Sequence, residues 1–116
     1  MNVQLFSEWL TPQTAAERVG SLSLIYSRLS VYTRELFLPE RTAGKERRVL
    51  EILHGLNEVH HTLAKWLVAY SSDEGKASTV TALGQQLLEI EREYRLENFV
   101  TAAIEAVRTN DGVVKR

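Results

Sequence analysis

Residues 49–70 read VLEILHGLNEVHHTLAKWLVAY, and the larger apolar side chains among them recur in alternating steps of three and four residues. That spacing places them on one face of an α-helix and is typical of a helix that packs along another helix. The face consists of Val49, Ile52, Leu56, Val59, Leu63, Trp66 and Tyr70. The pattern predicts a long helix that begins within residues 39–43 and ends near Tyr70, before the turn-forming residues 71–75.

The same periodicity continues upstream. It predicts a helix from Pro12 to Phe37, and Thr14 and Glu17 have the spacing of a capping box at its start. A short helix is predicted over residues 3–10. The main apolar stripe of the longer helix is predicted to be Ala15, Val19, Leu22, Tyr26, Leu29, Thr33 and Leu36.

The last segment, residues 78–109, carries two apolar stripes that point about 140° apart on a helical wheel. The pattern leaves open whether this segment forms one helix or two, and it favours a break near residues 94–97. The second half then needs its own neighbour, which is either the N-terminal segment, through Leu5, Phe6 and Trp9, or a second chain. Residues 110–112 are predicted to end the helix.

These elements predict an all-α fold. We expect an up-down helical bundle of three or four main helices with a short N-terminal helical segment. Residues 1–112 would form a single domain, and residues 113–116 a flexible C-terminal tail.

Composition narrows the classes of function. Fourteen Lys and Arg residues oppose fifteen Asp and Glu residues in a chain of 116, so there is no basic excess and nucleic acid is not an expected partner. The absence of cysteine excludes a disulfide framework, a thiolate zinc site and a cysteine nucleophile. No apolar run reaches the length of a membrane span and the first residues do not resemble a signal peptide, so we expect a cytoplasmic protein without a membrane partner.

A second stripe on the helix predicted over residues 12–37 is made of small residues. They are Ala16, Gly20, Ser23, Ser27 and Ser30, about 110° around the helix from the large apolar stripe. No charged residue occurs from Val19 to Ser27, whereas a solvent-facing helix normally carries Lys or Glu. Either the helix is buried inside one bundle, or it contacts a second copy of the chain.

We favour the second interpretation and predict a homodimer interface. It would comprise Gly20, Ser23, Leu24, Ser27 and Val31. The leading functional hypothesis is a non-enzymatic protein that acts through protein–protein association, as a homodimeric adaptor or regulatory subunit that binds itself or another protein.

A first alternative rests on Arg48, which precedes His54 by six residues. This pair resembles the Arg-x(4–6)-His pattern of HEPN-type helical-bundle ribonucleases. The resemblance implies a ribonuclease or toxin-type bundle in which Arg48 and His54 act near an RNA phosphate, often across a dimer axis.

A second alternative is a metal-binding helical bundle. His54, Glu58 and His61 share one helix face, and three such ligands with a water can hold zinc or another divalent metal. The chain offers no second Glu-x-x-His element for a di-iron site, so we expect no metal and no cofactor. His60 borders the apolar stripe, and we expect it to be partly buried and hydrogen-bonded.

Overall fold

The computed structural model describes residues 1–38, 44–72 and 76–114. It is 85% helical, and the five α-helices pack against one another, so the predicted all-α bundle is confirmed. No strand occurs in the described ranges. The elements in chain order are α1 (Val3–Leu10), α2 (Ala15–Glu35), α4 (Glu46–Ser71), the 3₁₀ turn η1 (Ala77–Thr79), α5 (Val80–Tyr94) and α6 (Glu97–Val114).

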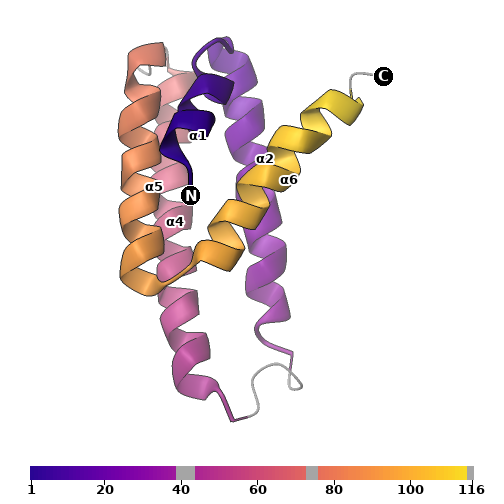
Figure 1. Cartoon of the computed structure of the whole chain (residues 1–116), viewed down its shortest axis with the longest axis vertical. Helices are drawn as coiled ribbons and strands as arrows, with labels where there is room; N and C mark the ends of the chain where they lie inside the picture. The colour runs from indigo at the N-terminus through magenta and orange to yellow at the C-terminus, as the bar shows by residue number, and fades with distance from the viewer. Residues whose placement is uncertain (39–43, 73–75, 115–116) are drawn as a thin grey trace.

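Along the long axis of a molecule that measures 45 × 31 × 24 Å, α2 runs down, α4 runs up and α5 runs down in the view of Figure 1. In Figure 1, α1 and α6 lie toward the viewer, α4 lies behind, and α6 crosses α2 obliquely. The core draws residues from every helix. Its largest fully buried apolar side chains are Tyr70, Phe6, Leu10, Leu22, Ile25, Leu29, Leu56, Leu63, Leu83, Leu87 and Leu96.

The start of α2 follows the capping signal in the sequence. The Thr14 side chain accepts a hydrogen bond from the Glu17 amide (3.1 Å), and the Glu17 carboxylate accepts one from the Thr14 amide (2.9 Å), so the predicted capping box is confirmed. The helix begins at Ala15, later than the predicted start at Pro12. The start predicted for α4, within residues 39–43, lies outside the described residues.

The predicted break in the last segment is confirmed. Helix α5 ends at Tyr94, Arg95 adopts a left-handed conformation (φ 57°), and α6 begins at Glu97. The stop predicted at residues 110–112 is wrong, because α6 continues through Val114. One glycine in a helix costs only about 1 kcal/mol relative to alanine, which is not enough to end it.

The neighbour expected for the second half of this segment differs from the one observed. Helix α6 packs across α2, where the Phe99 and Tyr32 rings meet edge to face at 6.0 Å. Helix α1 packs on α5 instead, with Phe6 against Gly84. The N-terminal helix is therefore not the main partner of α6, and the Met1 amino group pairs with Glu91 of α5.

This arrangement also corrects the apolar stripe predicted for α2. Tyr26 is 37% exposed and Val19 is only partly buried, whereas Ile25 is fully buried. Since α4 and α6 lie on two different sides of α2, the buried face is shifted toward Ile25. The predicted stripe assumed that α2 packs against a single helix, so it did not include Ile25.

Two buried charges are satisfied within the fold. The Glu91 carboxylate, 1% exposed, pairs with the amino group of Met1 (2.6 Å) and accepts a hydrogen bond from the Thr101 hydroxyl (2.9 Å). The Arg18 guanidinium donates to the carbonyls of Leu10 (3.0 Å) and Thr11 (2.9 Å), at the turn between α1 and α2. No buried side-chain nitrogen or oxygen of the described residues lacks a partner.

Candidate functional site

The small-residue face of α2 lies on the surface of the molecule. Gly20, Ser23, Leu24, Ser27 and Val31 are all exposed, and Leu24 keeps 57% of its accessible surface. The described helices do not cover this face. Burial inside one bundle is therefore not the reason why α2 lacks charged residues from Val19 to Ser27.

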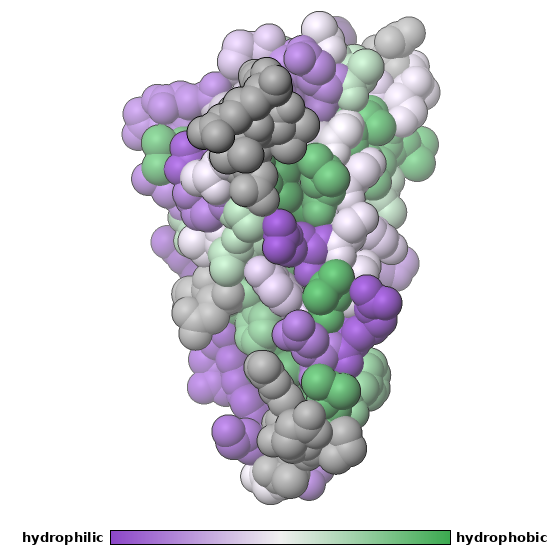
Figure 2. All heavy atoms as spheres, turned by 90° about the vertical axis from the view of Figure 1, so that its right-hand side faces the viewer, coloured by the Kyte–Doolittle hydropathy of each residue, from purple (hydrophilic) through white to green (hydrophobic). Residues whose placement is uncertain are grey.

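A shallow groove adjoins the exposed Leu24. It has a volume of about 420 Å³, and its lining is Trp9, Pro12, Gln13, Glu17, Gly20, Ser21 and Leu24. A Cβ atom added at Gly20 would meet no atom within 4 Å, so the backbone of α2 is open to a neighbour there. Figure 2, which views the side of the bundle that carries α2 and α6, shows separate hydrophobic patches between polar areas.

Arg48 is occupied by the corner between α5 and α6. Its guanidinium donates to the carbonyls of Tyr94 (3.1 Å) and Arg95 (2.8 Å), and it also pairs with Glu51 (3.2 Å). Helix ends leave carbonyl groups without partners inside the helix, and a cation is favourable beside them. Arg48 therefore caps the C-terminus of α5.

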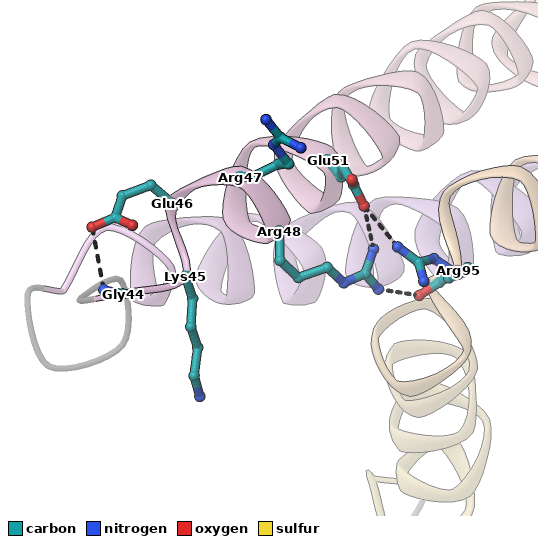
Figure 3. Close-up of a pocket in the computed structure, with 7 residues that line it drawn as sticks. All are labelled: Gly44, Lys45, Glu46, Arg47, Arg48, Glu51 and Arg95. Carbon is teal, nitrogen blue, oxygen red and sulfur yellow. Dashed lines mark hydrogen bonds and ion pairs between the residues drawn. The ribbon is translucent and has the colours of Figure 1, made fainter.

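Glu51 joins this network from α4. Its carboxylate also accepts a hydrogen bond from Arg95 (2.9 Å). This hydrogen bond is the largest cause that holds the pKa of Glu51 below its usual value, and the hydrogen bond from Arg48 is the second. Figure 3 shows Arg48 and Arg95 converging on Glu51, while Lys45 and Arg47 point away from that cluster.

The basic residues at the start of α4 line an open depression of about 420 Å³, together with Gly44 and Glu46. The guanidinium groups of Arg48 and Arg95 are already matched by a carboxylate and by two backbone carbonyls. Arg48 and Arg95 thus hold the corner of the fold together, and the cations around this depression do not converge on an empty space.

His54 is exposed, and it lines a different depression on α4, beside Leu50, Leu53 and Asn57. A separation of six residues places Arg48 and His54 about 120° apart around the helix axis. The structure does not bring the two residues together, so no described contact favours the ribonuclease alternative.

The three residues of the metal alternative, His54, Glu58 and His61, are all exposed on α4. Within the described ranges, no group of three His, Cys, Asp or Glu side chains is arranged to hold a metal ion. The shared helix face is a row of solvated polar side chains.

His60 lies between α2 and α4, as expected for a partly buried histidine. Its ring packs on the Tyr26 ring (4.5 Å between centroids), and its Nε2 atom is 3.5 Å from the Ser30 hydroxyl. Burial lowers the pKa of His60, and a hydrogen bond with the Tyr26 backbone partly opposes that effect.

No family model, curated protein or solved structure matches this chain. Among the helices of the described residues, none combines the length and the apolar character that a membrane crossing requires.

Leu50 and Val68 are exposed apolar residues of α4 that the sequence pattern did not single out. Both lie away from the main stripe of that helix. The sequence signal that could have identified Leu50 is a second row of uncharged residues on α4. That row can be recognised as a surface only once the helices that pack against α4 are known.

Proposed function

We propose that this protein works by self-association, as a homodimer that serves as an adaptor or regulatory subunit. The observation that carries the proposal is the outward face of α2, where Gly20, Ser23, Leu24 and Ser27 are exposed and no charged residue interrupts the sequence from Val19 to Ser27.

Small residues allow two helices to approach closely. The open backbone at Gly20 and the exposed hydroxyls of Ser23 and Ser27 leave room for a neighbouring helix. Leu24 and Val31 supply apolar surface, and burial stabilises an association by about 25 cal/mol per Å² of apolar area removed from water. The groove beside Leu24 offers space for an apolar side chain of the partner.

A role in protein–protein association agrees with the chemistry of the described residues. Arg48 is engaged by backbone carbonyls, and the exposed His54 has no described acid or base beside it as a hydrogen-bond partner. The proposal places the protein in the cytoplasm, in line with a chain that has no cysteine to pair in an oxidising compartment.

Analytical ultracentrifugation at micromolar concentration tests the proposal. We expect a species of twice the chain mass of 13.2 kDa. Ser27→Arg should shift it to the monomer, because a desolvated charge without a partner is costly. Ala82→Arg, a small-to-arginine change at an exposed position of α5, is the matched control and should remain dimeric. A wild-type protein that sediments only as a monomer would overturn the proposal.

A further inference from the structure

The contact between α2 and α4 carries uncharged rows on its outward side, beyond the buried core. On α4 the row advances in steps of three and four residues: Leu50, Leu53, Asn57, His60, Ala64 and Leu67. On α2 the matching row is Val19, Ser23, Tyr26, Ser30 and Thr33. We call these residues the α2–α4 face. None of them is Asp, Glu, Lys or Arg.

The two rows lie next to each other across the helix contact. Tyr26 of α2 packs on His60 of α4, and the Ser30 hydroxyl lies within 3.5 Å of the same imidazole. The residues one turn before and after these three continue the rows along each helix.

One further side of each helix is occupied by a neighbouring helix. Helix α5 covers the side of α4 that carries Arg48 and Trp66, whose indole donates to Gln86 (3.1 Å). Helix α6 covers the side of α2 that carries Tyr32. In Figure 1, α1 and α6 lie in front of the bundle and α4 lies at its back, so they do not cover the far side of α4.

The α2–α4 face is uncharged and uneven. Leu50 is 58% exposed, and Val68, which borders the row one turn after Ala64, is 69% exposed. A depression of about 230 Å³ lies beside Leu50, lined by Leu50, Leu53, His54 and Asn57. Protruding side chains and adjacent depressions are what knobs-into-holes packing of helices requires.

The charge pattern indicates a second copy of this chain as the occupant. In a two-fold contact, residues near the axis meet their own copies, so a charge there would meet a like charge. The α2–α4 face has none, while charged residues of α4 such as Glu58 and Lys65 lie at its edge. An uncharged centre with a charged rim is the usual anatomy of a protein interface.

The size of the face is sufficient for a dimer. Helix α2 has 21 residues and α4 has 26. At 1.5 Å per residue and about 10 Å between helix axes, the shared face covers roughly 30 × 20 Å, or on the order of 600 Å² in projection. Stable interfaces bury about 800 Å² of accessible surface per partner, which is more than their projected area.

We propose that two copies join through the α2–α4 face, so that α2 and α4 of both chains form a four-helix core around a two-fold axis. This inference rests on the proposed self-association. It extends the interface from the α2 residues Ser23 and Ser27 to α4, and it assigns Leu50, Asn57 and Ala64 to the dimer contact.

The test is Ala64→Glu, compared with Lys65→Glu on the same helix turn. Both positions are exposed, so both variants should keep the circular dichroism spectrum and melting behaviour of a folded helical protein at a concentration where the wild type is monomeric. Ala64→Glu should raise the dimer dissociation constant by at least about 100-fold, because an unpaired charge would be buried, whereas Lys65→Glu should change it by less than about threefold.

The outcomes separate this inference from the proposal on which it rests. If Ala64→Glu and Leu50→Glu both remain dimeric while Ser27→Arg is monomeric, self-association stands and the α4 contact is overturned. If the wild-type protein is monomeric at micromolar concentration, both proposals are overturned. If both α4 variants are folded monomers and Lys65→Glu is a dimer, the α2–α4 face is supported.

Discussion

The Tyr26 ring lies 4.5 Å from the imidazole of His60, centroid to centroid, and joins α2 to α4 where both helices border the surface. This contact places the only partly buried histidine of the described residues at a helix–helix boundary. His54 and His61, on the same helix, are exposed.

We predict that stability falls in mildly acidic solution because of His60. Its pKa is lowered from the ordinary value of 6.5 in the folded protein, so the unfolded chain binds the proton first as the pH falls. The stability contribution of neutral His60 is present above pH 6.5 and is lost as the pH falls through the folded pKa. His60→Gln should flatten the dependence of the melting temperature on pH between pH 7.5 and 5, while His61→Gln should retain it. Equal pH dependence in the wild type and His60→Gln would contradict the assignment.

Arg48 should stabilise the corner between α5 and α6. Arg48→Ala removes the hydrogen bonds to the carbonyls of Tyr94 and Arg95 and the ion pair with Glu51. Hydrogen bonds that involve a charged group contribute about 1.5–3 kcal/mol, so the free energy of unfolding in urea should fall by about that amount. Arg47→Ala, at an exposed neighbour, should change it by less than about 0.5 kcal/mol. Equal losses from the two variants would show that Arg48 is not a cap.

Two helical glycines should respond to alanine with opposite signs. A Cβ atom at Gly55 would lie 2.6 Å from Tyr94 Cβ and 2.7 Å from Leu96 Cδ1, so Gly55→Ala should lower the free energy of unfolding by about 1–3 kcal/mol. At Gly20 a Cβ atom meets nothing within 4 Å, and alanine should raise that free energy by about 0.5–1 kcal/mol. Both changes are best measured in the Ser27→Arg background, where association does not contribute. A stabilising Gly55→Ala would refute the close packing at that corner.

The buried carboxylate of Glu91 should be required for stability. Glu91→Gln leaves the partly buried Met1 amino group without its negative partner. Hydrogen bonds that involve a charged group contribute about 1.5–3 kcal/mol, so the melting temperature should fall in a thermal scan. Glu89→Gln, on the exposed side of α5, is the matched control and should melt within a few degrees of the wild type.

Local signals in the sequence predict much of the fold. The capping box at Thr14 and the spacing of apolar residues identify α2 and α4, and the change of stripe at residues 94–97 identifies the corner before α6. These features depend on neighbours within about one helical turn, which a sequence pattern contains.

Features that depend on distant neighbours could not be predicted in the same way. The close contact of Gly55 with Tyr94 joins positions far apart in the chain, and the burial of Ile25 depends on where α6 crosses α2. For the candidate surface, the sequence predicts Ser23 and Ser27 from the lack of charge. The α4 half of that surface follows only from the observed contact of Tyr26 with His60.

The close approach at Gly55 also makes the direction of α6 sensitive to very small changes. Helix α6 has 18 residues, so at 1.5 Å per residue its far end lies about 27 Å from the corner that rests on Gly55. A tilt of about 10° at that corner would move the far end by roughly 5 Å along the surface of α2. A single methyl group added at Gly55 would therefore tilt α6 about this corner, and the displacement would be largest at the C-terminal end of α6.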